Sequence, residues 1–315
     1  MTDAARGVAA MVAACTIWGL SGLYYKLLDH VPPLEVLAHR TLWSLVFFAG
    51  VLAVQGRLAG LAAALDRPGK IARILAAALF ISANWFLFIF SVQSGRATEA
   101  SLGYYIFPLV AVLLGVVAFG ERLTRAQAVA VALAVLAVGV LAAGEGVAPW
   151  ISLALAGTFG LYGLMKKRLA VGPVTSVTAE VALLAPVALA ILWSVHREGG
   201  TFGTGLGDSL LLMLSGPLTA TPLMLFAYAT RRVAYATVGL VQYLNPTLQF
   251  LVAVLIFGEP FGLYDAVAFP LIWTALALYS VAALRRERAA RSAARAASAE
   301  SAGVTSPRSD GAAKP

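Results

Sequence analysis

The sequence predicts an all-α integral membrane protein, with ten transmembrane helices arranged as two inverted five-helix repeats. The first observation is composition, because hydrophobic residues make up 60% of the 315 residues and charged residues only 12%. An ordinary soluble domain carries about a quarter charged residues. The second observation is a series of apolar segments, each long enough to cross a bilayer, and the third is a stretch of sequence that occurs twice.

Hydropathy divides the chain into apolar segments of about twenty residues, the length that a helix needs to cross about 30 Å of hydrocarbon. The mean hydropathy of the whole chain is +0.85. We expect ten spans, at 7–27, 34–54, 71–92, 100–119, 126–143, 149–169, 177–195, 209–229, 236–257 and 263–284.

The internal repeat is clearest at the ends of the fourth and ninth spans. Residues 102–121 read LGYYIFPLVAVLLGVVAFGE and residues 240–259 read LVQYLNPTLQFLVAVLIFGE, so an offset of 138 carries Glu121 onto Glu259. A second offset, of 141, relates the first span to the sixth, where WGLSGL at 18–23 corresponds to FGLYGL. Two long related units in apolar sequence are typical of secondary transporters.

Each copy of the repeat holds five spans, and an odd number makes the second copy enter the membrane from the opposite side. The repeats are therefore expected to be inverted, with a pseudo-two-fold axis in the membrane plane. The expected parts of the chain are a cytoplasmic N-terminus at 1–6, a first repeat at 7–143, a second repeat at 149–284 and a cytoplasmic tail at 285–315.

The distribution of Lys and Arg predicts the orientation. With both termini inside, the outer segments hold only Lys26, Arg96 and Arg197, and nearly all other basic residues lie in inner segments. This bias predicts a multi-pass protein of the cell (inner) membrane with both termini cytoplasmic. It also accounts for the net charge of +8, so nucleic acid is not an expected partner. The basic, Ala-rich and Ser-rich tail is expected to continue the last helix briefly and then to be disordered.

Several of these segments resemble a known family. They are Trp18-Gly19, Pro32-Pro33 before LEVLAHRTLWSL, Asn84-Trp85, GYYIFPLVAVLLGVVAFGE and QYLNPTLQFLVAVLIFGEPF. Together they resemble the EamA family of the drug/metabolite transporter superfamily, and within it the RarD-type permeases. The resemblance covers about 7–284. It implies ten helices in two inverted repeats, a central substrate cavity and export of small organic solutes.

Arg40 is the one basic residue deep inside an expected span, since Lys26, Arg73 and the basic residues at 166–168 lie near the ends of theirs. A charge near the bilayer centre costs about 2.5 to 3.5 kcal/mol on insertion scales, so Arg40 should face protein or a water-filled cavity. The offset of 141 carries His39 onto Glu180, which makes Glu180 a candidate partner, and Glu35 competes with it. Arg40 is either a substrate or gating contact or half of a structural ion pair. His39 is either a packed histidine or, with Glu180, a proton-coupling group.

The ninth span carries an amide stripe of Gln242, Asn245 and Gln249, at spacings of three and four residues. Pro246 in this stripe and Pro108 in the fourth span each remove a backbone donor, so helix breaks are expected at both. Paired breaks beside polar groups are typical of a transporter's midplane site. In the alternative interpretation, the prolines only bend two helices and the amides join neighbouring helices.

Aromatic residues within the spans are expected to form the rest of a substrate pocket, together with one asparagine of the third span. Aromatic walls with a few amides suit planar or amphipathic organic solutes better than inorganic ions. The expected lining residues, besides Arg40, Glu180 and the amide stripe, are Asn84, Trp85, Tyr105, Tyr162 and Tyr243.

These features predict a secondary transporter of small organic metabolites or drug-like solutes that works by alternating access, and the family resemblance implies that it is an exporter. The alternatives are a non-transporting membrane scaffold and, further off, an intramembrane enzyme. An enzyme would need a nucleophile with a base, and His39 is the only deep histidine. With the single Cys15 and no ligand cluster, neither a metal nor a cofactor is expected. The expected partners are the solute and the lipid bilayer, and a homodimer is compatible with the sequence.

Overall fold

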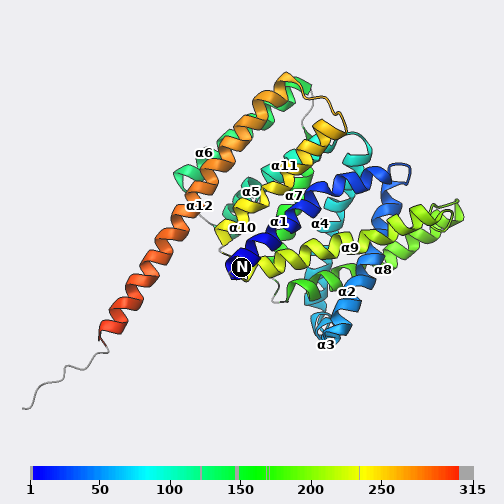
Figure 1. Ribbon diagram of the computed structural model, residues 1–315, viewed down its shortest axis with the longest axis horizontal. Coiled ribbons are helices and arrows are strands. Elements are labelled where there is room, and N and C mark those ends of the chain that lie inside the picture. Colours follow the sequence, from blue (N-terminus) through cyan, green and yellow to red (C-terminus); the bar gives the residue numbers. More distant parts are fainter. Residues whose placement is uncertain are drawn as a thin grey trace, which may run out of the picture.

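The fold is a bundle of helices (Figure 1). The computed structural model describes residues 3–120, 123–145, 149–167, 169, 171–233 and 235–304. In these ranges the only β-type pairing is an isolated bridge between Phe202 and Gly205. Glu121, the repeat counterpart of Glu259, and residues 305–315 of the tail lie outside the described part of the chain.

The first half of the chain forms α1 to α6, and the second half forms α7 to α12 with a short π-helix, η1. The first six helices are α1 (Asp3–Leu27), α2 (Pro33–Val54), α3 (Leu58–Ala64), α4 (Pro68–Gln93), α5 (Ala97–Phe119) and α6 (Arg125–Glu145). The others are α7 (Trp150–Lys167), α8 (Pro173–Arg197), α9 (Leu206–Thr230), α10 (Tyr235–Gln242), α11 (Leu244–Leu251), η1 (Val252–Ile256) and α12 (Leu263–Val304).

Eight helices of the described chain are long and apolar enough to cross a membrane, against the ten spans expected. They are α1, α2, α4, α5, α6, α8, α9 and the first part of α12. The two other expected spans take different forms. The sixth is α7, an 18-residue helix that ends on Lys166 and Lys167. The ninth is divided into α10, α11 and η1.

The interruption of the ninth span follows from Pro246, which lies in the first turn of α11. Proline has no N–H for the carbonyl four residues earlier, which belongs to Gln242, and α10 ends at that residue. The fourth span behaves differently, because α5 continues through Pro108 to Phe119. Of the two expected helix breaks, only the one at Pro246 is therefore present. At Pro108 the helix continues, because neighbouring helices can support a proline inside a continuous helix.

Local sequence explains where several helices begin and end. Proline occupies the first helical position of α2, α4 and α8, where its missing N–H is not needed. α5 ends at Gly120, whose φ of 65° lies in the left-handed region that favours glycine. The last helix is longer than the expected span 263–284, because α12 continues to Val304 and extends well beyond the bundle (Figure 1).

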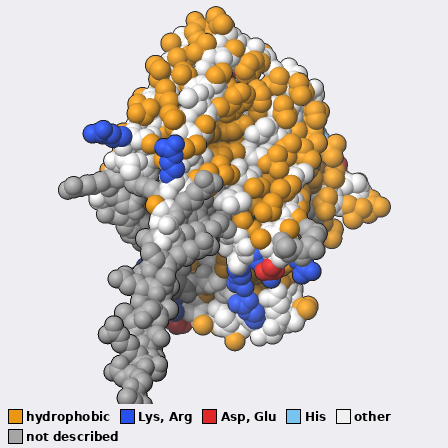
Figure 2. Space-filling model, turned by 60° about the vertical axis from the view of Figure 1, so that its left-hand side comes forward, with side chains coloured by type: hydrophobic (Ala, Val, Ile, Leu, Met, Phe, Trp, Pro, Cys, Tyr) orange, Lys and Arg blue, Asp and Glu red, His pale blue; other side chains and the backbone are white. Residues whose placement is uncertain are grey.

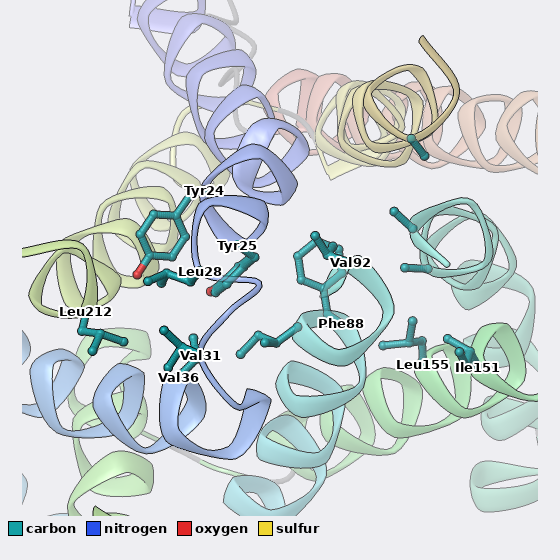
Figure 3. Packing of buried hydrophobic residues seen from close by; sticks show 14 residues of the cluster. Tyr24, Tyr25, Leu28, Val31, Val36, Phe88, Val92, Ile151, Leu155 and Leu212 are labelled. Atoms are coloured by element: carbon teal, nitrogen blue, oxygen red, sulfur yellow. The ribbon is translucent and has the colours of Figure 1, made fainter. Parts of the chain in front are cut away.

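Helices that are far apart in sequence pack side by side. α2 lies against α8 and α9, α7 lies against α4 and α5, α6 lies along α12, and α1 contacts α9 and α11 (Figure 1). The largest buried faces are apolar, and Figure 3 shows side chains of α1, α4 and α7 meeting in one of these clusters. On the face shown in Figure 2, hydrophobic side chains cover a broad area, and the Lys and Arg side chains in view lie at its left and near its lower edge.

Loops that the sequence assigns to the outer side contact one another at one end of the bundle. The Glu259 carboxylate accepts hydrogen bonds from the backbone N–H groups of Ala97 and Thr98, at 2.6 and 2.7 Å. At the same end, Glu35 of α2 accepts a bond from the backbone N–H of Thr201, at 2.9 Å. Because Thr201 follows the end of α8, α2 and α8 run in opposite directions.

Candidate functional site

Arg40 lies in the middle of the bundle with aromatic partners. Its side chain is 7% exposed, and its Nη1 donates to the hydroxyl of Tyr25 at 2.5 Å. The guanidinium carbon lies 4.1 Å from the centre of the Trp85 ring and 5.8 Å from that of Tyr25. Figure 3 shows Tyr25 of α1 beside Phe88 of α4, with ring centres 5.8 Å apart. A cation between aromatic faces is stabilised by their quadrupoles.

No carboxylate of the described chain forms an ion pair with Arg40, and its buried Nε has no hydrogen-bond partner there. The expected partner Glu180 bonds elsewhere, as does the competing Glu35, whose oxygens accept from Thr201. Of the two interpretations of Arg40, the structural ion pair is therefore absent. A buried guanidinium that keeps an unused donor remains able to bind a ligand.

Glu180 forms a second polar centre, on α8. Lys166 of α7 donates to Glu180 at 2.5 Å and to the Ser176 hydroxyl at 2.6 Å. Tyr162 donates to the other carboxylate oxygen at 3.2 Å, and Ser176 completes the set at 2.9 Å. Glu180 is 1% exposed, and its buried charge is balanced by Lys166, which also belongs to the second half of the chain.

Helix direction explains why Arg40 and Glu180 do not meet. Each is the eighth residue of its helix. Because α2 and α8 run in opposite directions, positions that lie short of the midpoint of each helix fall on opposite sides of the midplane, more than about 10 Å apart at 1.5 Å per residue. Symmetry-related positions approach each other only near the midplane. The offset of 141 made Glu180 the counterpart of His39, the neighbour of Arg40, and counterparts in two repeats do not have to be in contact.

Trp85 and Tyr162 connect the two centres by packing. Both contact the cluster that contains Ile81 and Val181, which lies between α4, α7 and α8. Tyr162 stacks on Phe159, with ring centres 6.1 Å apart. An apolar aromatic wall thus extends between Arg40, which has no ion-pair partner in the described chain, and Glu180, which is paired with Lys166.

Asn84 uses its whole side chain inside the bundle. Its Nδ2 donates to the carbonyl of Leu155 at 3.0 Å and to the hydroxyl of Thr158 at 3.2 Å, and its Oδ1 accepts from Tyr104 at 2.9 Å. Asn84 is 1% exposed. It therefore joins α4, α5 and α7, and its amide has no donor left for a solute.

In the amide stripe, some side-chain atoms form hydrogen bonds and one buried oxygen does not. Gln249 donates through Nε2 to Oδ1 of Asn245 at 3.1 Å, while its own Oε1 is buried without a partner in the described chain. Gln242 is the last residue of α10 and Tyr243 follows it at the interruption. Tyr105 and Tyr243, which the offset of 138 relates, both pack in the cluster between α5, α6 and α12. Tyr105 also shares a 2.7 Å hydrogen bond with Thr247.

His39 points away from this region. It is 5% exposed, its ring lies 4.7 Å from that of Phe202, and it lines a cavity of about 530 Å³ between α2 and α8. The walls of this cavity include Trp43 and Trp193. Because adjacent residues of a helix diverge by about 100 degrees, His39 and Arg40 face different surroundings.

Tyr25, Lys166 and Ser176 belong to these centres, although no pattern in the sequence indicates them. Lys166 counted only as an inner basic residue, although its position one turn from Tyr162 on the same helix was visible. Within the described ranges, no group of His, Cys, Asp and Glu side chains has the arrangement of a metal site.

Comparison with known proteins identifies the family. Residues 5–143 match the EamA-like transporter family. The protein RarD of Streptomyces exfoliatus is 44% identical over 277 residues, which cover 87% of this chain and 88% of that protein. An uncharacterized transporter of Vibrio cholerae is 38% identical over 293 residues, covering 92% of this chain and 97% of the relative.

A solved structure supports the fold. A protein known from a crystal structure is similar with a TM-score of 0.57 and 19% sequence identity, covering 90% of this chain and 99% of that one. At this identity the similarity concerns the fold alone. The relatives, in contrast, match at high identity over nearly their full length, and the helices of this chain are long and apolar. The chain belongs to the EamA-like transporter family and is a multi-pass membrane transporter.

Proposed function

We propose that this chain is a secondary transporter that exports small organic solutes across the inner membrane by alternating access. The observation that carries the proposal is Arg40, a buried cation among aromatic rings from other helices with an unpartnered donor. A membrane scaffold gains nothing from an uncompensated charge at this depth, whereas a solute site needs one polar anchor in an apolar pocket.

The proposal includes ten membrane crossings, two inverted repeats and cytoplasmic termini. Equivalent contacts in the two halves support it. A Cβ on Gly19 would lie 2.6 Å from Leu248, and one on Gly160 would lie 3.4 Å from Val110. The offset of 141 relates the two glycines, and the offset of 138 relates the two residues that they contact. Such an exchange is expected when a two-fold axis relates the repeats.

Alternating access requires that one end of the bundle be closed while the other opens. The hydrogen bonds of Glu259 with the start of α5 join the two halves at the outer end. The interruption at Tyr243 gives the ninth segment a place to bend. Glu180 and His39 are the titratable side chains proposed for proton coupling, and uniport is compatible with the same arrangement.

Solute flux through purified protein tests this function. Wild-type protein in ATP-free proteoliposomes should exchange labelled solute from a panel of amino acids, aromatic metabolites and drug-like amides. Trp85→Leu removes the ring over Arg40 and should slow exchange about tenfold. The matched control is Trp150→Leu, because Trp150 is 46% exposed and lies beside Arg96, at 5.5 Å, instead of Arg40. Equal rates in both variants would remove the site, and no flux of any solute would favour a scaffold.

A further inference from the structure

We infer that the transported solute carries a carboxylate, and that Arg40 binds this carboxylate through Nε and Nη2. The inference rests on the proposed function and names the solute class that its site accepts. A guanidinium offers three nitrogens, and in this chain they are in different surroundings. Nη1 donates to Tyr25, the Trp85 ring covers one face, and Nε is buried without a partner.

The free edge of Arg40 has the geometry that a carboxylate needs. Nε–H and one N–H of Nη2 are parallel and point the same way, so they can donate to both oxygens of one carboxylate. The Tyr25 bond is on the opposite nitrogen, Nη1, and leaves the buried Nε without a hydrogen-bond partner among the described residues. Aromatic rings hold the guanidinium plane, which limits the entropy lost when a ligand binds.

The charge balance of the bundle points to an anion from outside the chain. The buried carboxylates of the described residues are Glu35, Glu180 and Glu259. Glu35 is bonded to Thr201, Glu180 to Lys166, and Glu259 to the start of α5. None is left for Arg40, and a buried cation without a counterion is costly. A solute carboxylate would remove that cost during each transport cycle.

A second unpartnered group is on the same face of α2. Ser44 is one turn beyond Arg40, is fully buried, and its Oγ has no hydrogen-bond partner among the described residues. One guanidinium edge with one hydroxyl matches a singly charged carboxylate. A phosphate group carries more charge and three acceptor oxygens, so it would need further donors.

The surroundings of Arg40 also constrain the rest of the solute. Trp85, Phe159 and Tyr162 share one apolar wall beside the guanidinium, and Tyr25 packs edge-on against Phe88. Aromatic walls favour a planar or otherwise apolar body. The inferred class is therefore a small amphipathic monocarboxylate, which includes zwitterions whose amino group leaves the carboxylate free.

The test measures binding to purified protein by thermal stabilisation, separately from flux. The probes are phenylacetate, indole-3-acetate and hexanoate, each compared with its methyl ester and primary amide, and with chloride and inorganic phosphate. At least one carboxylate should stabilise wild-type protein. Its ester and its amide should bind at least about tenfold more weakly. Arg40→Gln should abolish this difference, and Arg40→Lys, which keeps the charge but not the fork, should fall between.

Arg96→Gln is the matched control. Arg96 also lies beside a tryptophan, Trp150, at 5.5 Å, but it already pairs with Glu99 at 2.5 Å, so its loss should leave carboxylate binding at the parental level. Stabilisation by no carboxylate, equal binding of the esters or amides, or equal binding of the inorganic anions would each overturn the inference. Exchange of neutral solutes by wild-type and Arg40→Gln protein alike would overturn it while leaving the transport function intact.

Discussion

At the scale of single residues, buried polar groups in this chain are of two kinds. Asn84 and Glu180 have their hydrogen-bonding atoms satisfied by neighbouring helices, and they hold the bundle together. Arg40 and Gln249 each keep a buried atom without a partner in the described chain. In lipid, where water cannot supply the missing bond, the second kind marks the places where a ligand gains most from binding.

Asn84 should contribute to stability and little to selectivity. Asn84→Ala removes bonds to Leu155, Thr158 and Tyr104, and leaves buried partners unsatisfied. We expect the free energy of unfolding to fall by about 1 to 3 kcal/mol, since an orphaned buried group costs about that much. Thermal unfolding in detergent measures this, with Asn245→Ala as a control because the Asn245 side chain forms one hydrogen bond within the described chain, accepted from Gln249. A changed order of solute preference with unchanged stability would contradict the assignment.

At the scale of elements, different contacts join the helices at the two ends of the bundle. At one end, Glu259 caps the start of α5, where a carboxylate is favoured by the helix dipole. The opposite end packs α3 against α8 through Ala64 and Ala179. The interruption of the ninth segment was expected from Pro246, but the sequence could not show that α5 would remain continuous through Pro108. Proline removes the same donor in both places, and the packing around each helix decides the outcome.

Removing the charge of Glu259 should open the outer end more often. Glu259→Gln keeps the side-chain volume but weakens the cap by about 1 kcal/mol or more, so the open population should rise several-fold. A cysteine at Val31, 1% exposed at this end, should then react faster with a membrane-impermeant maleimide in a Cys15→Ala background. Asp265→Asn is the control, because Asp265 caps its own helix through Gly262. Unchanged labelling would show that Glu259 is not a closing contact.

At the scale of the whole molecule, the exchange of contacts between repeats predicts the topology. Leu123 and Pro260, both exposed, follow the two Phe-Gly-Glu ends of the repeat. In an inverted arrangement, single cysteines at Leu123 and Pro260 should react with impermeant reagent from opposite faces of the membrane. Gly205→Cys, in the loop between α8 and α9, should react from the same face as Pro260→Cys. Labelling of Leu123→Cys and Pro260→Cys from the same face would refute inversion.

The sequence alone determined the class of the protein, most of its helices, its internal repeat and its family. These depend on composition, on apolar length and on order along the chain, all of which are local properties. Tertiary structure decided which polar groups pair. Lys166 takes the carboxylate expected for Arg40, and Tyr25 and Trp85 surround the guanidinium instead. The partner of a buried charge depends on the direction, rotation and depth of several helices at once, and none of these is written in the residues nearby.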